Sequence, residues 1–112
     1  MRLVNLYAPN DYRIDQVERP TVGPRDALLK VEYCGICGSD VGYVAQGGLA
    51  GPTGEPMPLG HELSATLAEA GCELQGFSPG DRVCVNPMGG GNAIGNGGTE
   101  GGFTDYLLVR NA

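Results

Sequence analysis

The chain has 112 residues, a length that suits one domain, and 41% of them are hydrophobic, which argues against intrinsic disorder. Its 13 acidic and 7 basic side chains give a formal net charge of −6, which argues against nucleic acid or an anionic membrane as partner. No apolar stretch approaches the roughly 20 residues that span a bilayer. The first residues are too polar for a signal peptide, so we expect a cytoplasmic protein with reduced thiols.

Short strands are predicted along most of the chain. Residues 1–7 and 12–18 are expected to form a hairpin around the turn-forming residues 8–11. Residues 26–33 alternate, but Leu28 makes both faces partly apolar, which predicts a buried strand. Residues 62–70 fit a strand or a short helix, with a strand favoured, and further strands are expected at residues 82–85 and 103–109. Because no segment keeps the helical period for more than about eight residues, the pattern indicates a mainly β domain, a small barrel or sandwich.

Glycine is unusually frequent, with 20 residues, or about 18% of the chain against a usual ~7%. Eight of these glycines lie in residues 88–102, which we expect to form a mobile surface loop that buries no core of its own. A phosphate cradle is not expected there. No glycine in the chain precedes a lysine, and no G-x-G-x-x-G spacing occurs, so the sequence carries no nucleotide-binding fingerprint.

The cysteines leave several interpretations open. In a reducing compartment, the C-x-x-C pair formed by Cys34 and Cys37 fits a metal site, a redox pair or two buried small side chains. A redox pair is disfavoured, since it needs the first turn of a helix and Gly35 and Gly38 oppose one. Because no second C-x-x-C follows, a structural zinc site made of four cysteines is excluded.

The single histidine, His61, stands between a glycine that lets the backbone turn and Glu62. A lone histidine is more often structural than a ligand. However, a cysteine, a histidine and a carboxylate with one open position are the donors of a catalytic zinc, which polarises an alcohol or carbonyl oxygen. Asp40 is a candidate to accept from the other ring nitrogen and so fix the tautomer of the imidazole.

Four motifs follow one another along the chain: residues 34–40 (CGICGSD), 60–62 (GHE), 80–83 (GDRV) and 101–106 (GGFTDY). In this order they resemble the zinc-containing alcohol dehydrogenases of the medium-chain dehydrogenase/reductase superfamily. The resemblance covers essentially the whole chain. The first motif is most similar to that of the sorbitol and threonine dehydrogenases.

This resemblance implies a fold and a set of site residues. The fold is a GroES-like, partly open β-barrel with short helical segments. Cys37 and His61 would ligate the catalytic zinc, with Glu62 behind the metal or directly on it. Ser39 matches the hydroxyl that takes the proton of the substrate, and Asp40 matches the partner of the histidine ligand.

The other cysteines match no ligand of the family. Cys34 corresponds to a common cysteine that is not a ligand, and burial as a small apolar group is the expected role. Cys72 and Cys84 are expected to serve ordinary packing.

Three departures from the family pattern matter. Residues 88–102 contain no cysteine, so no structural zinc is expected there. Gly42 stands where relatives often carry a histidine that passes the proton to solvent. We also expect residues 1–112 to be an incomplete GroES-like domain with the Rossmann domain absent, so that NAD(P) binds only with that missing domain.

These observations predict the catalytic-domain part of a zinc-dependent alcohol or polyol dehydrogenase, inactive alone and with a weak zinc site. Its substrate would be a small-molecule alcohol or polyol. We expect self-association through the surface left bare by missing segments. The alternative is a free-standing GroES-like binding or assembly module without catalysis, which would take up no zinc.

Overall fold

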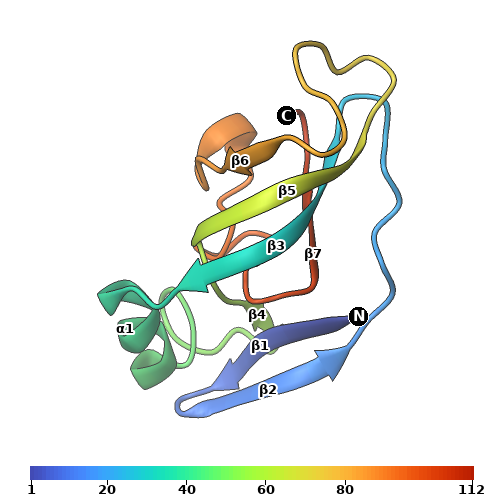
Figure 1. The fold of residues 1–112 in the computed structure, drawn as a ribbon. Helices are drawn as coiled ribbons and strands as arrows, with labels where there is room; N and C mark the ends of the chain where they lie inside the picture. The colour runs from blue at the N-terminus through green and yellow to red at the C-terminus, as the bar shows by residue number, and fades with distance from the viewer.

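The computed structural model describes residues Met1 to Ala112 as two antiparallel sheets with a short helix beside them (Figure 1). The first sheet has the order β2-β1-β4, with β1 (Arg2–Ala8), β2 (Asp11–Gln16) and β4 (Met57–Pro58). The second has the order β6-β5-β3-β7, with β3 (Ala27–Gly35), β5 (Glu62–Ala70), β6 (Arg82–Cys84) and β7 (Tyr106–Val109). The sheets do not close into a barrel, which confirms the expected partly open, mainly β architecture.

The hairpin at the N-terminus forms as predicted. β1 and β2 pair antiparallel with Ala8 opposite Asp11, so Pro9 and Asn10 make the turn. Asn10 has a φ of +59°, a left-handed conformation that asparagine tolerates better than most residues. β2 ends at Gln16, two residues before the predicted end.

The strand predicted to be buried on both faces is β3, and the prediction holds only for its first three residues, since Lys30, Glu32 and Tyr33 are exposed. Ala27, Leu28 and Leu29 at the start of β3 are at most 5% exposed, and β3 lies between β5 and β7. The main core packs against one face of this sheet and contains Ala27, Leu29, Leu63, Ala65, Leu67, Ile94 and Leu107. A smaller cluster of Leu6, Met57 and Leu59 lies at the first sheet.

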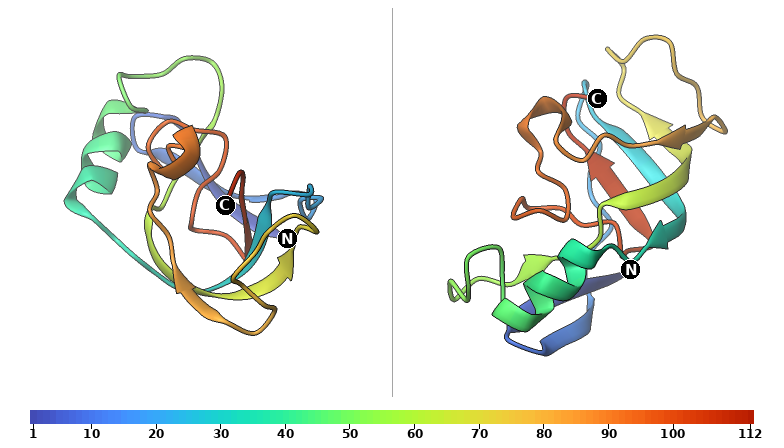
Figure 2. Two further views of the ribbon diagram at one scale, coloured as in Figure 1. Left: turned by 90° about the horizontal axis from the view of Figure 1, so that it is seen from above. Right: turned by 90° about the vertical axis from the view of Figure 1, so that its left-hand side faces the viewer.

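The glycine-rich segment 88–102 is not the surface loop that we expected. Ile94 from its middle is 0% exposed and belongs to the main core, and Gly101 and Gly102 are buried. Figure 2 shows this segment, in orange, folded back beside the second sheet. Glycine permits this close approach, since a Cβ on Gly95 would lie 2.1 Å from the carbonyl oxygen of Gly60. The high glycine content gave no sign that Ile94 would be buried in the core.

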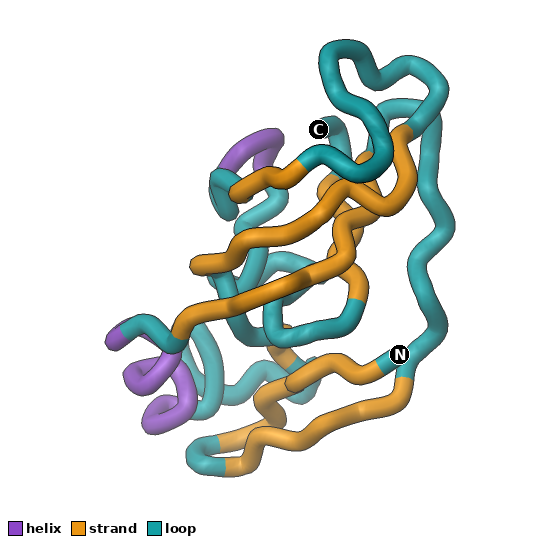
Figure 3. Tube along the Cα trace, in the orientation of Figure 1, coloured by secondary structure: helices purple, strands orange, loops and turns teal.

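The helix α1 (Gly38–Gln46) was missed by the sequence analysis and is the longer helical element in Figure 3. The Asp40 carboxylate accepts a hydrogen bond of 2.9 Å from the backbone N–H of Cys37, the N-cap residue. Gly47 ends the helix with a φ of +86° and donates to the Tyr43 carbonyl. The argument that glycine opposes a helix here was therefore wrong, because the two ends are stabilised locally. Neither α1 nor the 3₁₀ turn Gly89–Gly91 has the length and apolar character of a membrane-crossing helix.

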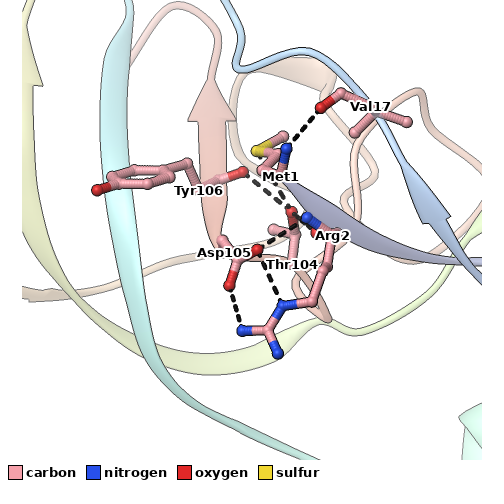
Figure 4. A network of polar contacts seen from close by, with 6 residues as sticks. All are labelled: Met1, Arg2, Val17, Thr104, Asp105 and Tyr106. Atoms are coloured by element: carbon pink, nitrogen blue, oxygen red, sulfur yellow. Dashed lines mark hydrogen bonds and ion pairs between the residues drawn. The ribbon is translucent and has the colours of Figure 1, made fainter.

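The two sheets are joined by the segment that precedes β7. The predicted last strand, 103–109, is shorter than expected because its first residues pair with β1: Val4 donates to the Phe103 carbonyl at 2.9 Å. Figure 4 shows the polar contacts at this junction. The Asp105 carboxylate accepts from the Arg2 backbone N–H at 2.7 Å and from its guanidinium at 2.6 Å, and the Thr104 hydroxyl donates to the Arg2 carbonyl.

This junction predicts a specific acid sensitivity. Hydrogen bonding to Arg2 lowers the pKa of Asp105 to about 2, so its stabilising contribution is present above the ordinary pKa of the carboxyl and is lost as the pH falls through about 2. Because the Arg2 side chain is 69% exposed, we expect a contribution of about 1 kcal/mol or less. Urea unfolding of wild type and Asp105→Asn between pH 5 and 2 tests this. The gap in stability should narrow toward low pH, and a constant gap would contradict the assignment.

Candidate metal centre

Three potential metal donors meet at one end of the second sheet. Antiparallel pairing places Gly35, at the end of β3, opposite Glu62, at the start of β5. Cys37 follows the first strand by two residues, and His61 immediately precedes the second. One donor atom each from Cys37, His61 and Glu62 lies within 4.8 Å of the others. The register of two strands thus brings together residues 24 and 25 positions apart in the chain.

His61 follows a turn in the backbone that requires a glycine at position 60. Gly60 has a φ of +99°, and a Cβ there would lie 2.6 Å from the backbone nitrogen of Phe103 and 3.0 Å from the Cys34 sulfur. Its carbonyl accepts from the Gly102 N–H at 2.8 Å. The turn predicted at this glycine is confirmed, and the close contacts show why no side chain fits.

Asp40 connects two of the three donors. Its carboxylate is 3% exposed; Oδ2 accepts from the Cys37 backbone, while Oδ1 faces Nδ1 of His61 at 3.4 Å. That distance is longer than an ordinary hydrogen bond, and both facing atoms are buried without another partner. A small movement of the imidazole toward Asp40 would let Nδ1 and Oδ1 form a hydrogen bond, so that both buried atoms would have a partner.

Ser39 lies on the opposite side of the imidazole. Its hydroxyl is 3.3 Å from Nε2 of His61 and donates to the Cys37 sulfur, also at 3.3 Å. With Nδ1 directed at a carboxylate, the favoured tautomer carries its proton there, which leaves the Nε2 lone pair directed toward the thiol and the hydroxyl. Nε2 is thus the nitrogen available to a metal.

The donor set fits zinc. A thiolate, an imidazole nitrogen and a carboxylate are typical zinc ligands, and an imidazole ligand commonly donates its other N–H to a carboxylate, as His61 can to Asp40. Glu62 is exposed, so its carboxylate can turn toward a metal or away from it.

Cys34 is close to this cluster but differs in chemistry. Burial raises the pKa of its thiol to about 11, so this thiol ionises less readily than an ordinary cysteine. It is partly buried and packs against the main core, as expected. The expectation that Cys72 and Cys84 serve ordinary packing was wrong, since both are exposed.

These differences predict an order of thiol labelling. At pH 8, iodoacetamide should modify the exposed Cys72 and Cys84 first and Cys34 last, since exposure and thiolate character control the rate. Addition of zinc should protect Cys37 alone. Peptide mass spectrometry over a time course measures each rate, and labelling of Cys34 as fast as Cys84 would contradict the burial of its thiol.

Sequence reasoning named all five polar residues of this cluster but missed that Asp40 also holds the Cys37 backbone. The available signal was the spacing of an N-cap residue and an acidic residue three positions later, weakened by a cysteine where serine or threonine is usual. Gly42, in α1, offers no side chain to move a proton onward from Ser39.

Comparison with known proteins identifies the family. The family model described as "Alcohol dehydrogenase GroES-like domain" matches residues 23–112. Rat sorbitol dehydrogenase is 40% identical over 83 residues, 73% of this chain and 23% of that protein. (R,R)-butanediol dehydrogenase of Bacillus subtilis is 32% identical over an alignment that covers 97% of this chain and 38% of that protein.

Solved structures agree in fold. The crystal structure of 2R,3R-butanediol dehydrogenase from Bacillus subtilis superposes with a TM-score of 0.82 at 29% identity, covering 97% of this chain and 38% of the other. An alcohol dehydrogenase from Escherichia coli, solved with the cofactor NADH, gives 0.79 at 26% identity, covering 99% of this chain and 36% of the other.

The fold and the site together define a class of protein. It is a mainly β, GroES-like domain with a thiol, an imidazole and carboxylates at one end of a sheet. The chain belongs to the family of alcohol dehydrogenase GroES-like domains, as its resemblance to the medium-chain dehydrogenases implied. It spans about a quarter to two fifths of the length of the curated relatives that it matches.

Proposed function

We propose that this chain is the metal-holding part of the catalytic domain of a zinc-dependent alcohol or polyol dehydrogenase. The observation that carries the proposal is the convergence of the Cys37, His61 and Glu62 donors within 4.8 Å, with the buried Asp40 behind the imidazole. A carboxylate placed at the ring nitrogen that faces away from the other donors is the usual partner of a histidine that ligates a metal.

Each side chain has a defined part in the proposal. Cys37 and His61 hold the zinc, Glu62 supplies a further oxygen, and Asp40 orients the imidazole. Zinc in such a site polarises an alcohol or carbonyl oxygen and eases loss of the alcohol proton. The Ser39 hydroxyl, 3.3 Å from the Cys37 sulfur and from Nε2 of His61, would accept that proton while its own hydroxyl proton passes to water.

Hydride transfer in this proposal needs a cofactor site that these 112 residues do not provide. The nicotinamide must be held against the substrate carbon, and the sequence contains no dinucleotide fingerprint. NADH is present in one structure that this fold resembles. We therefore assign NAD(P) binding to a further domain of the complete enzyme and expect these residues alone not to turn over.

Zinc uptake tests the proposal directly. Equilibrium dialysis of the purified chain against zinc, followed by metal analysis, should give about one zinc per chain, as one site of these donors predicts. Binding should release protons, since the thiol must ionise. Absence of uptake at free zinc up to about 1 mM, far above the range of structural and catalytic zinc sites, would contradict the proposal and favour a binding or assembly module.

A further inference from the structure

The outer edge of the first sheet is unpartnered. β2 is the terminal strand of that sheet, and no other segment pairs with its outer side. Tyr12 and Ile14 are 61% and 69% exposed, although they lie on the same sheet face as the buried Leu6. An edge strand with exposed apolar side chains is a site where another strand can add.

The hydrogen-bond pattern shows which backbone groups are free. Met1 donates to the Val17 carbonyl at 2.7 Å and Val17 donates back at 2.9 Å, so these two residues form a hydrogen-bonded pair. In an antiparallel ladder such pairs recur every two residues, so Asp15 and Arg13 also bond inward to β1. The N–H and C=O groups of the intervening residues Tyr12, Ile14 and Gln16 therefore point outward.

β2 lacks two of the devices that block pairing at an edge, and its charged residues, Asp11, Arg13 and Asp15, are of both signs. It contains no proline and no lysine, and the register shift in the hairpin lies between Leu6 and Ala8, on the inner strand. The outward groups of Tyr12, Ile14 and Gln16 thus form a regular row.

We propose that a second copy of this chain pairs with β2 in antiparallel orientation, with Ile14 opposite Ile14 of the second copy. With the two-fold axis on Ile14, residues whose N–H and C=O groups point outward face one another. Ile14 faces Ile14 of the other copy, and Tyr12 faces Gln16 of the other copy. All three contacts are then hydrogen-bonded pairs. A register centred between Arg13 and Ile14 would instead oppose an inward-bonded residue to an outward one.

The charges of β2 favour the same register. With Ile14 on the axis, Arg13 lies opposite Asp15 of the second copy, and Asp15 lies opposite Arg13. These are non-hydrogen-bonded positions, where facing side chains approach most closely and opposite charges stabilise the pair. Centring on Gln16 would place Arg13 opposite Arg19, and centring on Tyr12 would engage a shorter part of the strand.

The side chains are already held on the correct face. Arg13 pairs with Asp11 at 2.9 Å and stacks over the Tyr7 ring at 4.2 Å, while Asp15 accepts from Asn5 and Tyr7. The Arg13 side chain is still 57% exposed, so its guanidinium can accept a second carboxylate as neighbour. One strand pair buries little area, so we expect a dissociation constant on the order of 10–100 µM.

Amide hydrogen exchange gives the sharpest test. In dilute protein, the amides of Arg13, Asp15 and Val17 should exchange slowly and those of Tyr12, Ile14 and Gln16 quickly. At protein concentrations near 1 mM, about tenfold or more above the expected dissociation constant, the second set should become protected. Protection that appears elsewhere on the molecule, or a monomer at that concentration by light scattering, would overturn the proposal.

Substitutions separate this interface from a folding defect. Ile14→Pro removes an outward N–H that the monomer does not use, and should weaken the dimer about tenfold or more. Arg13→Asp and Asp15→Arg each oppose like charges and should be monomeric alone, yet form a mixed dimer when combined. Arg25→Asp, the same charge change at an exposed ion pair elsewhere, should leave the dimer intact. A dimer that survives Ile14→Pro, or no mixed dimer, would overturn the proposal.

Discussion

Replacing Cys37 or His61 with alanine is expected to abolish measurable zinc binding while leaving the fold intact. Each substitution removes one of only two strong zinc donors. The loss of zinc affinity should therefore exceed the roughly 10- to 100-fold loss that follows when the hydrogen-bonding partner of a ligand is removed. Isothermal titration with zinc measures affinity, and circular dichroism checks the fold. Glu62→Gln should cost less, since this side chain is exposed and free to turn away.

Asp40→Asn and Glu69→Gln form a matched pair for the same measurement. Both remove one carboxylate charge, but Asp40 is buried against His61 and Glu69 is exposed near the other end of β5. Only the first should weaken zinc binding, by roughly 10- to 100-fold. Equal effects would indicate a general charge effect and contradict the role of Asp40 in orienting the imidazole.

Gly60→Ala is expected to destabilise the turn that precedes His61 strongly. The residue has a φ of +99°, and its Cβ would lie 2.6 Å from the Phe103 backbone nitrogen, which is held by a 3.0 Å hydrogen bond to the Leu59 carbonyl. Backbone strain of about 1–3 kcal/mol and overpacking of about 1–3 kcal/mol act together here. Urea denaturation should therefore show a loss of about 2–6 kcal/mol, or no folded protein.

A control for this variant is Gly76→Ala. Gly76 also has a positive φ, of +83°, but its Cβ would meet nothing within 4 Å. Gly76→Ala should cause only the backbone strain, so its loss of stability should be clearly smaller than that of Gly60→Ala. If both variants lose the same amount, the contact with Phe103 does not constrain the turn before His61.

The sequence was most informative where local chemistry decides the outcome. The hairpin around Asn10 and the left-handed conformation at Gly60 depend on residues whose conformational preferences are strong. The cluster of Cys37 and His61 was expected from donor chemistry and from resemblance to a family, since no local pattern states that β3 and β5 pair with Gly35 opposite Glu62.

The errors share a physical cause, which is tertiary contact. The helix at residues 38–46 is too short to show a period, and it is stabilised at its start by Asp40. The glycine-rich segment looked unable to contribute to a core, but Ile94 from its middle is buried in the core against the second sheet. Cys72 and Cys84 were assigned to packing by residue type, yet both lie in exposed positions that only the chain path determines.

X-ray absorption at the zinc edge tests the central claim most directly. For the zinc-loaded chain we expect one sulfur at about 2.3 Å, from Cys37, together with nitrogen or oxygen at about 2.0–2.2 Å, from His61 and Glu62. The sulfur contribution should vanish in Cys37→Ser and persist in Cys34→Ser. A zinc shell without sulfur, or one whose sulfur depends on Cys34, would contradict the site described here.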